Sequence, residues 1–120
     1  MKIAIPSETD EGLSSVRSGH FGHCAYFTLV DIEDGEIKNV EAVKNVDHDE
    51  FGCGGVIEYA LGLGIEAILV AGMGVPPFTR FTQGGVAVYI DQEVPYVQDV
   101  VDKFIKGDIP RMQPGQACRH

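Results

Sequence analysis

Short apolar runs alternate with polar, glycine-containing segments along the chain, and this pattern predicts a succession of strands and helices. Runs rich in β-branched and aromatic residues predict strands over residues 2–5, 25–32, 36–44, 66–71 and 86–90. Apolar residues at helical spacing predict helices over residues 54–63, 76–83 and 95–106. The predicted order is therefore β-β-β-α-β-α-β-α, and Asp34-Gly35 predicts a hairpin between the second and third strands.

The order of the elements also predicts the direction of the strands. A βαβαβ-like second half makes strands one, four and five parallel, with right-handed crossovers, while the first three strands form an antiparallel meander. The third strand has mixed polarity over residues 36–44, which suits the edge of a sheet. We expect one domain over residues 1–107, followed by a flexible tail over residues 108–120 that lacks a periodic pattern.

Three loops are expected to meet at one edge of this sheet. They cover residues 7–24, 45–53 and 72–74, and each lies at the end of the sheet where strand one ends. In open α/β sheets this carboxyl edge is where ligands bind. The strand directions therefore predict a binding site formed by loops that are far apart in the sequence.

Composition and charge restrict the class of protein. The 120 residues are 44% hydrophobic and 22% charged, which is typical of a globular chain. No apolar run approaches the ~18 residues of a membrane span, and the N-terminus turns polar too soon for a signal peptide, so we expect a cytoplasmic location. The formal net charge of -9 repels phosphate backbones, and neither nucleic acid nor membrane is expected as a partner.

Soft, metal-preferring side chains are concentrated in the predicted loops. The stretch SGHFGHCAYF carries His20, His23 and Cys24, and the second loop carries His48 and Cys53. Thiolate and imidazole groups select zinc, copper(I), iron or iron–sulfur clusters. A cytosolic chain with three cysteines and no CxxC motif is more typical of free thiols or metal ligands than of a disulfide framework.

The tail offers a further sulfur–nitrogen pair, Cys118 and His120. About twelve extended residues span ~40 Å at ~3.3 Å each, which is enough to reach the same edge. The metal-ligand candidates are His20, His23, Cys24, Cys53, Cys118 and His120. Other interpretations stay open, with Cys24 as a small buried hydrophobic residue, His48 in a solvated turn and Met73 covering the core.

Backbone groups at the same edge favour an anionic ligand. Helix N-termini expected near residues 54 and 75 expose N–H groups and the positive end of a helix dipole, and the first of them favours the thiolate form of Cys53. The candidates for contact with a cofactor are Arg17, Gly54, Gly55, Gly72 and Gly74. The glycine cluster around Cys53 lacks the lysine of a P-loop and the spacing of a dinucleotide fingerprint, so no nucleotide is predicted.

Several motifs occur together in a characteristic order. They are MKIAIP at the start, His20-Phe21-Gly22 followed by Tyr26-Phe27, the hairpin VDIEDGEIKNVE, the glycine cluster at 52–55, GMG after the fourth strand, and GGVAVY. Through them the sequence resembles the dinitrogenase iron–molybdenum cofactor biosynthesis proteins, the NifX/NifB C-terminal-like group, over about residues 1–107. The resemblance implies a ribonuclease H-like, three-layer α/β fold. Its five-stranded mixed sheet would have the order 3-2-1-4-5, with strand two antiparallel, and about three helices.

The resemblance also implies a function. Proteins of this group are carriers or chaperones of an iron–sulfur or molybdenum-containing cluster and have no catalytic activity of their own. Their expected partners are the cluster and a protein that donates or accepts it, and we expect a monomer or a weak homodimer. The histidine of the HFG motif, here His20, is the family residue most associated with cluster binding, and Phe21 and Gly22 of the same motif are candidates for cofactor contact.

This chain departs from the family pattern at two places. His23-Cys24 stands where many relatives have a basic residue followed by alanine, and Cys53 stands where glycine or alanine is frequent. These changes leave a zinc- or small-anion-binding regulatory module open, because zinc prefers four ligands from Cys and His. A cysteine hydrolase that pairs Cys53 with His20 is also open, whereas a two-metal nuclease would need clustered carboxylates that the first strand does not carry.

Overall fold

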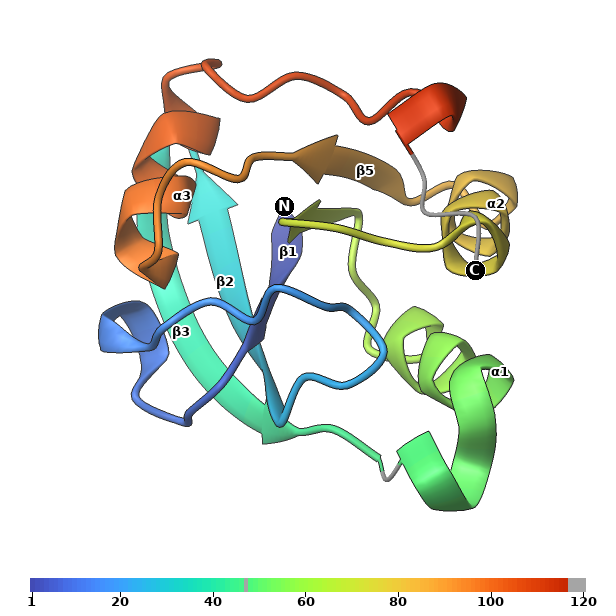
Figure 1. Cartoon of the computed structure of the whole chain (residues 1–120). Coiled ribbons are helices and arrows are strands. Elements are labelled where there is room, and N and C mark those ends of the chain that lie inside the picture. Colours follow the sequence, from blue (N-terminus) through green and yellow to red (C-terminus); the bar gives the residue numbers. More distant parts are fainter. Residues whose placement is uncertain (47, 117–120) are drawn as a thin grey trace.

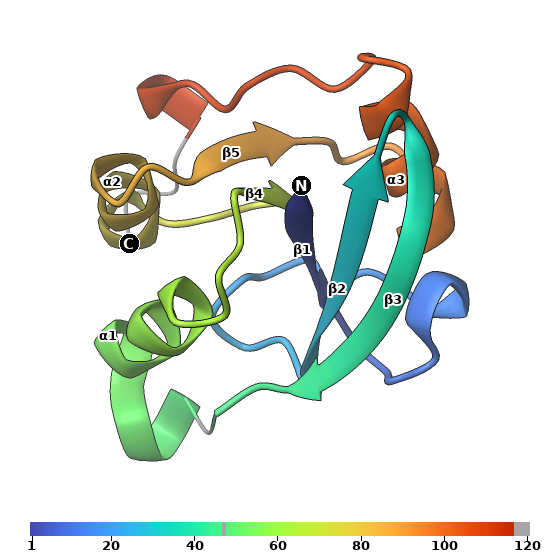
Figure 2. The ribbon, with the colours of Figure 1, turned by 180° about the vertical axis from the view of Figure 1, so that it is seen from behind.

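A five-stranded mixed sheet in the order β3-β2-β1-β4-β5 forms the middle of the computed structural model (Figures 1 and 2). Its strands are β1 (Lys2–Ser7), β2 (Tyr26–Glu33), β3 (Glu36–Lys44), β4 (Ala67–Val70) and β5 (Ala87–Ile90). Strand β2 is antiparallel to β1 and β3, while β4 is parallel to both β1 and β5. The expected α/β class, strand order and strand directions are confirmed; the name ribonuclease H-like rests on the resemblance alone.

The structure describes the backbone of residues 1–46 and 48–116 and the side chains of residues 1–46 and 54–115. Helices α1 (His48–Leu61) and α2 (Val75–Gln83) cover one face of the sheet, and α3 (Val97–Ile105) covers the other (Figure 1). Two short 3₁₀ helices, Gly12–Ser14 and Pro114–Gln116, lie in the loops. None of the helices among the described residues combines the length and the apolar character that a bilayer span requires.

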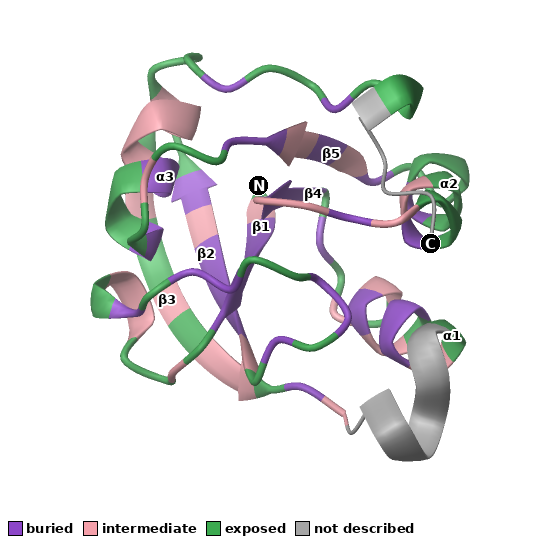
Figure 3. Ribbon diagram, viewed as in Figure 1, coloured by how far each residue is buried: buried purple, intermediate pink, exposed green. Residues whose placement is uncertain are grey.

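Each face of the sheet carries its own apolar core, because successive side chains of a strand point to opposite faces. Ile3 and Ile5 of β1 pack with α3, whereas Ala4 between them packs with α1 and α2. The central strands β1 and β4 are accordingly buried along most of their length (Figure 3). In the hairpin that joins β2 to β3, Asp34 and Gly35 have φ values of 54° and 75°, as a two-residue turn of this kind requires.

Helix α1 begins six residues earlier than the sequence pattern predicts. Residues 48–53, expected as a loop, form its first turns. The sequence pattern did not predict a helix here because it has glycines at 52, 54 and 55, and each glycine lowers helix propensity by about 1 kcal/mol relative to alanine. Packing of Val56, Ile57 and Ala60 against the sheet outweighs that cost. Cys53 is therefore the sixth residue of α1, so the expectation that it lies at a helix N-terminus is wrong.

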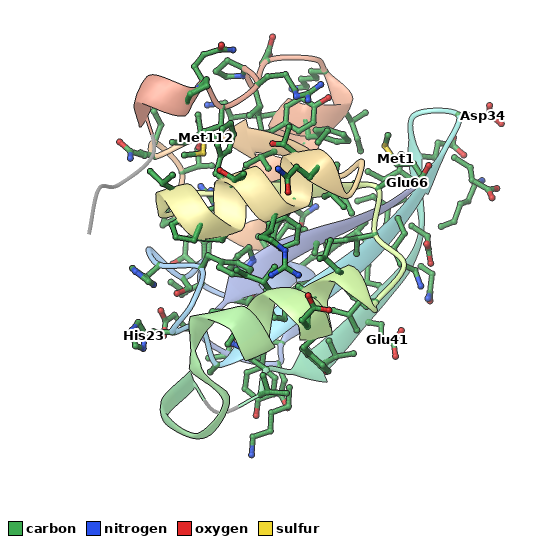
Figure 4. All side chains as sticks on the ribbon, turned by 90° about the vertical axis from the view of Figure 1, so that its right-hand side faces the viewer. Met1, His23, Asp34, Glu41, Glu66 and Met112 are labelled. Carbon is green, nitrogen blue, oxygen red and sulfur yellow. The ribbon has the colours of Figure 1, made fainter. Side chains whose placement is uncertain are left out.

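The segment after α3 covers the outer edge of β5, which differs from the flexible tail expected over residues 108–120. The Ile90 N–H donates to the Pro110 carbonyl at 3.1 Å, and the Met112 N–H donates to the Val88 carbonyl at 2.8 Å. Ile109 and Met112 are buried, and Figure 4 shows Met112 on the side covered by α2. Two isolated apolar residues give no periodic pattern that would predict an ordered element from the sequence. Their burial nevertheless packs this segment against the body of the protein. Cys118 and His120 lie outside the described residues.

Candidate functional site

The first and third predicted loops meet at the carboxyl ends of β1 and β4. The chain continues from β1 toward β2 on one side and from β4 toward β5 on the other, so this is the position where ligands bind in open α/β sheets. A Cβ atom at Gly72 would lie 3.5 Å from the carbonyl oxygen of Gly19, so the two loops are in backbone contact. The predicted convergence of these two loops is confirmed.

A cavity of about 340 Å³ opens beside this contact. Its wall contains Arg17, Ser18, Gly19, Ala71 and residues 92–95. The segment 92–95, which follows β5, was missed by sequence reasoning because it carries no motif. The only available signal was its position after a parallel strand, at the same carboxyl edge.

Arg17 holds this segment in place. Its side chain is only 4% exposed, and Nη1 lies 3.3 Å from Oδ2 of Asp91. Nη1 also donates to the Val94 carbonyl at 2.8 Å, and Nη2 donates to the Asp91 carbonyl at 2.8 Å. Burial lowers the pKa of Arg17, while the nearby Asp91 carboxylate opposes that change. Because Asp91 already neutralises the guanidinium, the structure gives Arg17 a positioning role in place of the expected contact with an anionic ligand.

Asp91 connects three parts of the chain. Its carboxylate is 6% exposed and also accepts a hydrogen bond of 2.6 Å from Nζ of Lys103 on α3. The N–H groups of Glu93 and Val94 donate to Oδ2 at 3.2 and 3.3 Å. Burial alone would raise the pKa of Asp91, but the hydrogen bonds from Lys103 and the backbone lower it overall. The same contacts with Asp91, and a second with Glu93, raise the pKa of Lys103.

The HFG motif forms a hydrogen-bonded turn that displays two imidazole rings. The Ser18 hydroxyl donates to the His20 carbonyl at 3.0 Å and accepts from the His20 N–H at 3.3 Å. The Gly22 N–H donates to Nδ1 of His20 at 3.1 Å. Both His20 and His23 are exposed, their ring centroids are 4.9 Å apart, and His23 points away from the body of the molecule (Figure 4). This turn brings together two of the six metal-ligand candidates.

Phe21, between the two histidines, fixes the turn to the core. It is 2% exposed, and its ring contacts Phe81 of α2 edge-on, with centroids 5.3 Å apart. A second contact joins it to Phe27 of β2 at 5.9 Å. The ring is therefore an anchor, and the structure does not place it toward a ligand as the sequence-based candidate list expected.

Cys24 also faces the core. It is 4% exposed, and Asn45 Nδ2 donates to its carbonyl at 2.9 Å and lies 3.5 Å from its sulfur. Burial raises the pKa of the Cys24 thiol to about 12. Metals bind the thiolate form, which this environment opposes at neutral pH, so the geometry favours the alternative of a small buried hydrophobic residue. Met73, which is 1% exposed, likewise covers the core.

The expected anion site at two helix N-termini does not form as predicted. Gly54 and Gly55 lie inside α1, not at its start. At the start of α2, Pro76 and Pro77 carry no N–H, so two of the first three helical positions have no donor for an anion. Gly72 contacts the first loop, and Gly74 is the N-cap of α2.

Not every predicted ligand can be placed. The side chains of His48 and Cys53, as well as Cys118 and His120, lie outside the described residues. Within the part of the chain that is described, no three or more side chains of His, Cys, Asp and Glu form a group that could hold a metal ion. The described geometry therefore supplies an exposed pair of imidazoles beside a crevice, and no complete metal centre.

These features define a small α/β domain with a crevice at the carboxyl edge of its sheet. The family model described as "Dinitrogenase iron-molybdenum cofactor" matches residues 1–107, and the chain belongs to this family. An uncharacterized protein from Methanocaldococcus jannaschii is 30% identical over 115 residues, which covers 94% of this chain and 92% of the relative.

Two solved structures share the fold over nearly the whole chain. The crystal structure of PH0822 is 34% identical, with a TM-score of 0.78, and the match covers 93% of this chain and 96% of that one. The apo form of the orange protein from Desulfovibrio gigas is 26% identical, with a TM-score of 0.79, and the match covers 92% of each chain. The likeness therefore extends over nearly the whole fold of the chain.

Proposed function

We propose that this protein binds and carries an iron–sulfur or molybdenum-containing cluster, without catalysing a reaction, as an accessory protein of cluster biosynthesis in the cytoplasm. The observation that carries the proposal is the turn at His20 and His23, which holds two exposed imidazoles at the carboxyl edge of the sheet. Membership of the iron–molybdenum cofactor family supports a metal cluster as the cargo. The cluster would come from, or pass to, a second protein, with this chain acting as a monomer or weak homodimer.

The support for this turn as the binding element is the set of contacts that hold it in one conformation. Ser18 and Gly22 fix the backbone and one ring nitrogen of His20, and Phe21 is buried between α2 and β2. A turn that is already ordered loses little conformational entropy when it binds a ligand. The adjacent cavity supplies space at the same edge for part of a cluster or for its protein partner.

Anaerobic reconstitution tests this function. The purified protein would be incubated with iron and sulfide, or with tetrathiomolybdate, and then desalted. We expect a visible charge-transfer band and a stoichiometric metal content, both of which fall when His20 and His23 are replaced together by alanine. Cys24→Ala is the matched control, because it removes a candidate ligand that faces the core. Colourless, metal-free wild-type protein would refute the proposal.

A zinc-binding regulatory module is the second candidate. The short distance between the His20 and His23 rings favours it, since imidazole is a common zinc ligand. Two further ligands would have to come from residues outside the described side chains or from a partner. Stoichiometric binding of zinc alone, together with an increase in Tm, would favour this function over that of a cluster carrier.

A further inference from the structure

We infer that the face between the 3₁₀ helix Gly12–Ser14 and the start of α3 docks a second protein through a positively charged segment of that protein. The inference rests on the proposed function, because a carrier must meet the protein that donates or accepts its cluster. The 3₁₀ helix and α3 lie side by side (Figures 1 and 2). The docking surface consists of Leu13, Val16, Tyr96, Asp99 and Asp102.

The middle of the docking surface is apolar and open to solvent. Tyr96 is 48% exposed and Val16 is 43% exposed, and they are two of only four large apolar side chains exposed in the described part of the chain. They form an isolated antiparallel bridge, in which Cβ atoms of opposite residues are about 5 Å apart. Tyr96 also lines a cavity of about 530 Å³ together with Leu13. An exposed aromatic residue beside a hollow is typical of the residues that dominate binding between proteins.

The rim of this cavity is negatively charged. Of the described residues that line it, only Asp99 and Asp102 are charged. Neither forms an ion pair with another described residue, and the neighbouring Lys103 is directed to Asp91 at 2.6 Å. Carboxylates without a counter-charge favour a cationic occupant, and an arginine side chain can also stack on the Tyr96 ring. The surface therefore fits a segment that carries arginine or lysine beside apolar residues.

The docking surface adjoins the crevice at the carboxyl edge of the sheet. The Arg17 N–H donates to the Pro95 carbonyl at 2.8 Å, and both of these residues line the crevice. Their neighbours in the sequence, Val16 and Tyr96, belong to the docking surface. The same two segments thus border both features, and a protein held here lies next to the edge where we propose that the cluster binds.

The charge of the whole chain favours the same occupant. A formal net charge of -9 attracts a cationic partner before contact and increases its rate of association. Salt screens this attraction over a Debye length of about 10 Å at 0.1 M ionic strength. Binding at the docking surface should therefore weaken as salt is added.

A short acetylated and amidated peptide of alternating arginine and leucine is the probe, and a peptide with glutamate in place of arginine is its control. Nitrogen-15 HSQC titration of the full chain should show saturable shifts over residues 13–16 and 96–102 with the arginine peptide alone. Tyr96→Ala should raise the Kd about tenfold, as the loss of a central aromatic contact implies. Asp99→Asn combined with Asp102→Asn should raise it about fivefold.

Asp108→Asn is the matched control variant. It removes an exposed carboxylate that lines a different cavity, beyond α3, and should leave the Kd within about twofold of wild type. If Tyr96→Ala does not fold, as judged by circular dichroism, Asp102→Lys replaces it, since reversal of this charge should also abolish saturable binding.

Several results would overturn the inference. Shifts spread over the whole chain, equal binding of the two peptides, or wild-type affinity in the Tyr96 and aspartate variants would each do so. Sedimentation provides a further check, because a wild-type dimer that Tyr96→Ala dissociates would make a second copy of this chain the occupant.

Failure of this inference is distinguishable from failure of the proposed function, because the peptide titration uses no cluster and the reconstitution uses no partner. Uptake of a cluster without localised peptide binding would overturn the docking surface alone. Localised peptide binding by a protein that takes up neither tetrathiomolybdate nor an iron–sulfur cluster would overturn the proposed function and leave the docking surface in place.

Discussion

Replacing Asp91 by alanine tests whether the segment after β5 is held by a buried charge. Asp91 is 6% exposed and its carboxylate contacts Arg17, which is 4% exposed, and Lys103, which is 25% exposed. Removing the carboxylate leaves the Arg17 guanidinium buried with only carbonyl partners. Truncation of one partner in a buried pair costs about 3–5 kcal/mol. We expect about 3 kcal/mol, because Lys103 can turn toward solvent.

Thermal unfolding followed by circular dichroism measures this change. At ~3–6 °C per kcal/mol for a chain of this length, the Tm of Asp91→Ala should fall by about 10–15 °C. Glu93→Gln is the matched control, because Glu93 pairs with the same Lys103 but is 83% exposed. An exposed pair contributes about 0.5 kcal/mol or less, so this variant should differ little from wild type. A loss below about 1 kcal/mol for Asp91→Ala would refute the reasoning.

The pH dependence gives the same prediction a second test. Burial opposes the change, but hydrogen bonds from Lys103 and the backbone lower the pKa of Asp91 in the folded protein. The unfolded chain therefore binds the proton more readily, and the stabilisation is fully present above the unfolded pKa of about 3.9. It is lost as the pH falls through the lower folded value. The stability difference between wild type and Asp91→Asn should thus be constant near neutrality and shrink below about pH 4.

Three further predictions concern the support of the turn and the edge of the sheet. Cys24, buried with its pKa raised to about 12, should resist iodoacetamide in the native protein and react only after unfolding, as peptide mass mapping would show. Phe81→Ala should cost about 3–5 kcal/mol in denaturant unfolding, since it removes a fully buried ring that packs on Phe21. Ending the chain after Gly107 removes the buried Ile109 and Met112 and exposes the edge of β5. It should lower stability by about 3–5 kcal/mol and promote association in size-exclusion chromatography.

The strands could be predicted from the sequence because their signal is local. The third strand was expected over residues 36–44 and occupies Glu36–Lys44, and the Asp34-Gly35 hairpin has the backbone that its sequence requires. The start of α1 could not be predicted, because the glycines at 52, 54 and 55 argue locally against a helix. Only the packing of later residues of α1 against the sheet outweighs the low helix propensity of these glycines.

The meeting of the first and third loops was also predictable, since it follows from the strand directions. The roles of single side chains were not. The partner of Arg17 is Asp91, 74 residues away, and nothing near Arg17 in the sequence indicates that its charge is neutralised inside the protein. Cys24 is a candidate ligand by residue type, and only its place among core residues reveals that burial raises the pKa of its thiol. Such roles depend on tertiary contacts that local patterns do not encode.

The turn around His20 has some side chains that face solvent and others that face the core. Substitutions of the two groups are expected to have different effects on ligand binding and on stability. His20 and His23 are exposed, whereas Phe21 and Cys24 belong to the core on the side of α1 and α2. Residue types that look alike as ligand candidates therefore divide into those that can touch a cargo and those that hold the turn in place. Substitutions of the inward residues Phe21 and Cys24 should lower Tm but leave the Kd of the folded protein for tetrathiomolybdate nearly unchanged. Substitutions of the outward residues His20 and His23 should raise the Kd for tetrathiomolybdate. They should leave Tm within a few degrees, because exposed side chains contribute little to stability.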